Sequence, residues 1–169
     1  MKPISSKLFH SGLKYEKIKS LLSINLKSAC FNERRDAIKH LGLLSVGDSA
    51  VLFALNKILA SESEHEMHRF EAAKSLVLLG DWNVTVCRYL VQNLNNANQN
   101  IVEDLLKVII SSKNVQFVDK REETVQRLVE NLVKIVKGRN ERFALDACIC
   151  IGKLVNLQKS LLLLNLKMF

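Results

Sequence analysis

The sequence contains little proline, few aromatic residues and no long uncharged apolar run. Pro3 is the single proline and aromatic residues make up 6% of the 169 residues, which argues against a turn-rich β architecture. No stretch reaches the roughly 18 apolar residues that a membrane-spanning helix needs, so we expect no membrane contact. The N-terminal residues also lack the apolar core of a secretory leader.

The cysteines show no metal-binding or redox spacing. The four residues are Cys30, Cys87, Cys148 and Cys150, and no CxxC pair is present. Without such a pair or a leader, we expect free thiols in a reducing compartment, all four of them buried and inert. The sequence therefore predicts a cytoplasmic protein without disulfides, with the nucleus as the alternative location.

Charge is unevenly distributed along the chain. The net charge is +8, and the basic excess lies in residues 1–40 and 101–169, whereas residues 41–100 are mildly acidic. This pattern favours an ordinary solvated surface, with nucleic-acid or acidic-filament binding through the basic terminal regions as the alternative.

A short motif recurs along the chain, which is the signature of a repeat architecture. The segment RRDAIKHL (34–41) returns as RFEAAKSL (69–76), and fainter copies occupy residues 103–109 and 142–152. Apolar residues within the copies recur at helical spacing, so each copy is predicted to be a helix. In the fourth copy, Asp146-Ala147 matches Asp36-Ala37 and Gly152 falls where Gly42 does.

Two copies are followed by a Gly-Asp link, Gly47-Asp48 and Gly80-Asp81. We expect each glycine to end a helix in the left-handed conformation and each aspartate to cap the next helix. Farther along, Asp119 and Glu122 have the spacing of a capping box.

Helices at a period in the mid-thirties, with an R-x-x-A-x-x-x-L-G helix and a Gly-Asp link, resemble HEAT repeats. The strongest matches are Arg34–Leu59 and Arg69–Leu94. The resemblance implies an all-α, armadillo-like α-solenoid of about four stacked antiparallel helix pairs. It further implies an N-terminal arm over residues 1–13 and one repeat domain over residues 14–169, whose last repeat is incomplete. Such superhelical scaffolds bind proteins, by default on the concave surface.

Basic side chains occupy matching places in successive copies and are candidates for partner binding. They are Arg34, Arg35, Lys39, Arg69 and Lys74. Stacked repeats would align them as a basic ladder, although the favoured interpretation is that the arginines pair with acidic residues of the adjacent repeat. Trp82 is a further candidate, either as an exposed anchor or, as is favoured, as a cover for the end of a helix pair.

Catalytic motifs are missing from the sequence: it has no P-loop, no GxGxxG and no GxSxG. His65 and His68 suggest a metal site only weakly, because their spacing is three and no third ligand is evident. We therefore expect no catalytic residue, cofactor or metal. The predicted function is a non-enzymatic protein-interaction scaffold with an unidentified partner. A remote alternative is a HEAT-like protein that attaches bilin chromophores.

The C-terminal end is unusually apolar. When residues 151–152 are aligned with residues 41–42, Ser160–Leu164 fall in the first helix of a fifth pair. Such an end predicts an exposed apolar patch, and hence self-association or a longer array, unless the tail folds back over the last pair.

Overall fold

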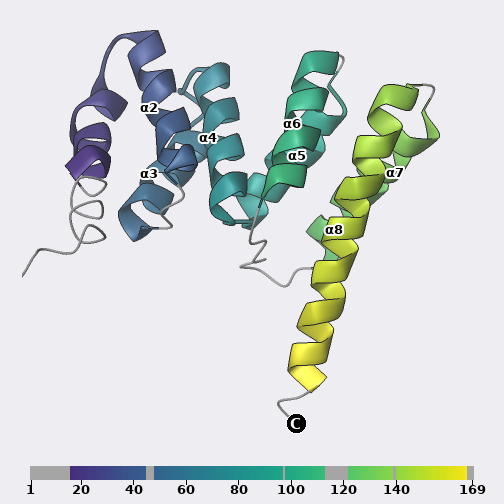
Figure 1. The fold of residues 1–169 in the computed structure, drawn as a ribbon. Coiled ribbons are helices and arrows are strands. Elements are labelled where there is room, and N and C mark those ends of the chain that lie inside the picture. Colours follow the sequence, from purple (N-terminus) through teal and green to yellow (C-terminus); the bar gives the residue numbers. More distant parts are fainter. Residues whose placement is uncertain (1–15, 45–47, 97, 113–121, 139, 167–169) are drawn as a thin grey trace, which may run out of the picture. The chain divides into compact units, whose positions relative to one another are not determined.

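The computed structural model describes residues 16–44, 48–96, 98–112, 122–138 and 140–166, with side chains except those of Glu122 and residues 156–166. This part of the chain is helical (Figure 1). Residues 16–23 form a first helix. It is followed by η1 (Asn25–Lys27), α2 (Phe31–Leu43), α3 (Ser49–Ala60), α4 (Glu66–Leu79), α5 (Val84–Leu94), α6 (Gln99–Ser111), α7 (Glu122–Lys137) and α8 (Glu141–Leu166).

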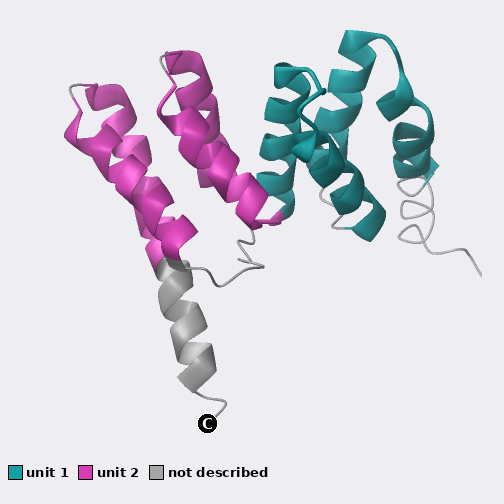
Figure 2. Ribbon diagram, turned by 180° about the vertical axis from the view of Figure 1, so that it is seen from behind, with its two compact units in different colours: residues 1–79 teal, residues 80–169 magenta. Residues whose placement is uncertain are grey.

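The chain divides into two compact units, residues 1–79 and 80–169 (Figure 2). In the first unit α4 packs on both α2 and α3. In the second unit α8 packs on α6 and α7, and α5 packs on the same two helices. Hairpin neighbours and alternate helices thus pack together within each unit, as in an α-solenoid, and the predicted all-α fold class is confirmed. A single domain over residues 14–169 stays a prediction, and the whole of the arm at 1–13 lies outside the described residues.

Small residues mark the closest helix contacts. The alanine of the repeated motif is 1% exposed at Ala37 and fully buried at Ala72 and Ala147. Gly42 of α2 lies directly against Ser75 of α4, where a Cβ built on the glycine would come within 2.5 Å of Ser75 Oγ. A larger side chain at either position would push the two helices apart.

The first Gly-Asp link behaves as predicted where it is described. Asp48 adopts an extended conformation, and its side chain accepts a hydrogen bond from the Ala50 amide at 2.8 Å. This carboxylate satisfies one of the amides that a helix start leaves unpaired. Gly47 and Asp119 lie outside the described residues, so their predicted roles stay predictions.

The second link follows the prediction only in part. Gly80 has φ 83° and ends α4 in the left-handed conformation, as expected. The expected cap at Asp81 is wrong, because Asn83 caps α5 by accepting from the Val86 amide at 3.1 Å. The two extra residues place Trp82 in the core, where it is 1% exposed. Asparagine caps as well as aspartate does, so burial of the indole decides the position.

The expectation that residues 160–164 belong to the first helix of a fifth pair is also wrong. Helix α8 runs without interruption over 26 residues, Glu141–Leu166. Residues 153–166 contain neither glycine nor proline, whereas the matching link of the first repeat contains Gly47. Nothing therefore stops the helix where a fifth pair was expected to begin. The side chains of Leu161–Leu164 lie outside the described ones, so the apolar patch expected there stays a prediction.

The cysteines differ from the expectation of four buried thiols. Cys87 and Cys150 are buried, and burial raises the pKa of each thiol to about 12, with a smaller contribution from nearby Asp81 and Asp146 respectively. Cys30 and Cys148 are exposed instead. All four are free of disulfide bonds, as predicted.

Candidate interaction site

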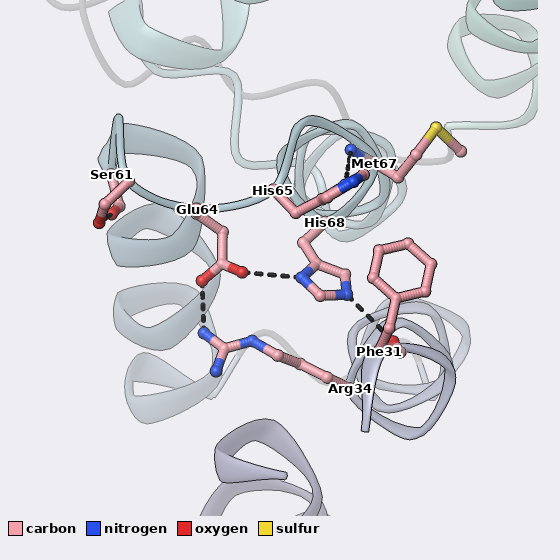
Figure 3. A network of polar contacts seen from close by, with 8 residues as sticks. Phe31, Arg34, Ser61, Glu64, His65, Met67 and His68 are labelled. Atoms are coloured by element: carbon pink, nitrogen blue, oxygen red, sulfur yellow. Dashed lines mark hydrogen bonds and ion pairs between the residues drawn. The ribbon is translucent and has the colours of Figure 1, made fainter. Parts of the chain in front are cut away.

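A polar network joins α2 to the start of α4 (Figure 3). The guanidinium of Arg34 forms an ion pair with Glu64, whose other carboxylate oxygen lies 2.7 Å from Nδ1 of His68. Nε2 of the same histidine lies 3.0 Å from the carbonyl oxygen of Phe31. Because carbonyl and carboxylate oxygens only accept, both ring nitrogens of His68 must carry hydrogen for both bonds to form.

Burial and stacking complete this network. His68 is 4% exposed, and its ring stacks on that of Phe31 with the centroids 4.6 Å apart. Partial burial works to raise the pKa of Glu64, but the hydrogen bond from His68 and the charge of Arg34 outweigh it and hold the pKa below its usual value. His68, one of the two histidines that weakly suggested a metal site, is therefore buried in a helix contact and bound to Glu64 and Phe31. The described residues contain no group of three or more His, Cys, Asp or Glu that could hold a metal.

Three of the other four basic candidates also have partners inside the first unit. Arg35 of α2 and Lys74 of α4 share Glu71, at 3.8 Å and 3.4 Å. This carboxylate is 5% exposed, so its negative charge is neutralised within the helix contact. Arg69 donates from Nε to the carbonyl of Leu59 on α3 at 3.3 Å, and Lys39 is exposed. The structure thus brings Arg35 and Lys74 together but directs Arg34 and Arg69 to different neighbours.

The second unit contains a comparable contact between α6 and α8. Arg142 of α8 pairs with Glu103 of α6 at 2.7 Å. A hydrogen bond from Lys107, together with the charge of Arg142, holds the pKa of Glu103 below its usual value. Farther along the same helices, the Nζ of Lys153 donates to the carbonyl of Ile110 at 2.8 Å and also to that of Ser112. Ion pairs and side-chain-to-carbonyl hydrogen bonds therefore stabilise the α2–α4 and α6–α8 contacts.

Two large apolar side chains lie exposed one helical turn apart on α8. Leu145 is 68% exposed and Ile149 is 46% exposed, with the exposed Cys148 between them. Sequence reasoning did not single out these residues. The sequence nevertheless indicated their exposure, because aligning Asp146 with Asp36 puts Leu145 and Ile149 at the places of the charged residues Arg35 and Lys39 in the first copy.

A hollow of about 600 Å³ lies between α7 and α8. Val129, Val133 and Val155 line it together with Gln126, Glu130, Lys134 and Lys137.

Trp82, the remaining sequence candidate, lies in the core at 1% exposed rather than on the surface. No described helix is both long enough and apolar enough to cross a membrane.

No known protein-family profile matches the chain. Over 145 residues it is 29% identical to Protein HEATR9 of Homo sapiens, a match that covers 83% of this chain and 25% of that protein. The chain is similar to a HEAT-repeat protein. The HEATR9 of Macaca fascicularis matches to the same extent, and the chain spans about a quarter of the length of either relative. The predicted resemblance to HEAT repeats is thereby confirmed.

A solved structure of an engineered protein shows the same kind of fold. It superposes with a TM-score of 0.52 at 16% identity, covering 81% of this chain and 62% of the engineered one. At this identity the likeness concerns the fold alone. Together with the HEATR9 match, it describes a helical repeat scaffold.

Proposed function

We propose that the protein is a non-enzymatic scaffold that binds a protein partner on the surface of its helices. The observation that carries this proposal is the pair Leu145 and Ile149, which are 68% and 46% exposed on one face of α8. Adjacent exposed apolar side chains are typical of protein interfaces, whereas single ones are common on any surface. The similarity to HEATR9 supports the scaffold part of the proposal.

Binding of nucleic acid or acidic filaments remains the alternative. Among the described basic candidates, Arg34, Arg35 and Lys74 already contact carboxylates, which reduces the positive charge that they offer to phosphate. Nothing in the described part of the chain specifically favours the bilin-attaching alternative.

We propose that the scaffold lies in the cytoplasm, with the nucleus as the alternative, because the exposed Cys30 and Cys148 are free thiols, which persist in reducing compartments.

The test is to isolate the native full-length protein with its bound partners and to reconstitute the complex from purified components. We expect a stoichiometric complex with a protein, weakened about tenfold or more by Leu145→Glu because a carboxylate would be buried at the interface. Lys57→Glu, an exposed change on α3, serves as the control. Binding to nucleic acid alone, with an affinity that collapses between roughly 50 and 200 mM salt, would instead establish the alternative.

A further inference from the structure

One kind of helix–helix contact occurs twice in the chain, with the same spacing of contacting positions along the earlier helix. Between α2 and α4, the hydroxyl of Ser75 donates to the carbonyl oxygen of Ile38 at 2.9 Å. Between α6 and α8, the thiol of Cys150 donates to the carbonyl oxygen of Leu106 at 3.6 Å. In both, a small donor on the later helix lies over the carbonyl of a buried apolar residue on the earlier helix.

The flanking positions on the earlier helix agree as well. Three residues before each acceptor stands a charged residue that pairs with the later helix, Arg35 with Glu71 and Glu103 with Arg142. Four residues after the acceptor, the earlier helix contacts the later one again. This second contact is Gly42 against Ser75 in the first unit, and the carbonyl of Ile110 with Lys153 in the second. If the acceptor residue is position i, the earlier helix thus presents positions i−3, i and i+4 to the later helix.

Helix α8 carries this same set of positions without a partner among the described residues. The alignment of Ala147 with Ala37 puts Leu145 at the place of Arg35, Cys148 at that of Ile38 and Gly152 at that of Gly42. Leu145, Cys148 and Gly152 are all exposed. A Cβ on Gly152 would meet no atom within 4 Å, whereas one on Gly42 would lie 2.5 Å from Ser75 Oγ.

We propose that Leu145, Cys148, Ile149 and Gly152 form a helix-docking face that accepts one α-helix of a partner protein. This inference rests on the proposed function and specifies the partner. The incoming helix carries serine, threonine or cysteine over the carbonyl of Cys148, as Ser75 lies over that of Ile38. Because Leu145 replaces Arg35, the residue opposite it is apolar rather than acidic. Gly152 lets the two backbones approach closely.

A second copy of the chain fits this face poorly. Its exposed α2 surface would present Asp36 and His40 at the places of Glu71 and Ser75. The carboxylate would then face the apolar Leu145 without a partner, and an imidazole would replace the small donor at the crossing point. A partner helix of α4 character therefore matches the face better than another copy does.

The probe is a peptide with the sequence of residues 66–79, held helical by a lactam bridge on its solvent face and carrying Glu71→Leu. Its binding to the full chain is followed by fluorescence anisotropy. We expect saturable one-to-one binding that falls about tenfold or more when the chain carries Gly152→Gln, since the side chain blocks the close approach. The chain variant Lys57→Gln should bind as the parent does, and a peptide with Ser75→Phe should not bind.

Folding does not confound this test, because the open space at Gly152 accepts a side chain. Thermal melting of Gly152→Gln should therefore match or exceed that of the parent. As a second measurement, the same peptide with Ser75→Cys is incubated in a glutathione redox buffer. It should form a disulfide with Cys148 in preference to Cys30, which is also exposed.

Absence of saturable binding, or binding indifferent to Gly152→Gln, would overturn the docking face. So would self-association of the parent that Gly152→Gln abolishes, because the occupant would then be a second copy. These failures are distinguishable from failure of the scaffold function. If the peptide does not bind but a native protein complex survives Leu145→Glu, the inference fails and the scaffold stands. If the peptide binds but no protein partner exists, the scaffold function fails, and the assignment of a partner helix to this face fails with it.

Discussion

Gly42 and Ser75 meet where α2 crosses α4, so closely that a Cβ on the glycine would lie 2.5 Å from the serine Oγ and 2.7 Å from its Cα. The serine hydroxyl uses this proximity to donate to the Ile38 carbonyl. One small residue on each helix thus fixes the distance and the register of the contact. The matching glycine on α8, Gly152, has no neighbour within 4 Å, which makes the two glycines a natural comparison.

Gly42→Ala should destabilise the protein although alanine favours helices. Overpacking costs about 1–3 kcal/mol, against a propensity gain of at most about 1 kcal/mol. Gly152→Ala brings the gain alone and should stabilise by about 0.5–1 kcal/mol. Urea denaturation followed by circular dichroism measures both. Equal stabilities for the two variants would mean that α2 and α4 do not approach as described.

Ala72→Glu should destabilise the first unit by several kcal/mol, because Ala72 is fully buried and the new carboxylate would have no partner. Lys57→Glu on the exposed side of α3 should stay within about 0.5 kcal/mol of the parent. Chemical unfolding of the two variants under identical conditions gives the comparison. If both lose the same stability, the buried face of α4 has been assigned incorrectly.

Glu64 should make the protein acid-sensitive. Its pKa is lowered in the folded state, so its ionised form contributes stability above the unfolded pKa of about 4.3, and this contribution is lost as the pH falls through the folded pKa. Glu64→Gln should therefore be less stable than the parent at neutral pH, and the difference should shrink towards about pH 3. Unfolding curves across this range measure it. A difference that does not change with pH would contradict the predicted role of the carboxylate.

Thiol reagents should distinguish two classes of cysteine. Cys30 and Cys148 are exposed and should react rapidly at pH 8. Cys87 and Cys150 are buried with pKa values raised to about 12, so their reactive thiolates form only on unfolding. Titration with an aromatic disulfide reagent, with and without denaturant, counts them. The double variant Cys30→Ser, Cys148→Ser should lose the rapid phase, and its persistence would place a buried cysteine at the surface.

Local signals in the sequence located the elements well, because a cap or a stop depends on a few neighbouring residues. Asp48 and Gly80 acted as their chemistry predicts. Asp81 did not, because Asp81 and Asn83, two positions apart, could each cap α5, and the burial of Trp82 between them decided for Asn83. Such a choice depends on packing from other helices, which the local sequence does not encode.

The candidate site was less accessible to sequence reasoning. Pairing of Arg34 with Glu64 joins residues 30 positions apart, and only the packing of α2 against α4 brings them together. The exposure of Leu145 could not be predicted from the fourth copy alone, because its apolar residues recur at the helical spacing that is typical of a buried face. Only the comparison of aligned copies separates it, because the first copy has a charged residue at the same place.

The repeated motif does not begin where the helical hairpins begin, because it lies on the second helix of a hairpin. The copies in α4, α6 and α8 each form the closing helix of one hairpin, after α3, α5 and α7 respectively, and the residues after α4 and α6 open the next hairpin. A gene duplication or deletion cut at the start of the motif would therefore halve two hairpins. Cuts in the links after α2 and α4 would add or remove a whole hairpin. The length of such an array can thus change in evolution without exposing half of a pair, provided that the cut falls after the motif.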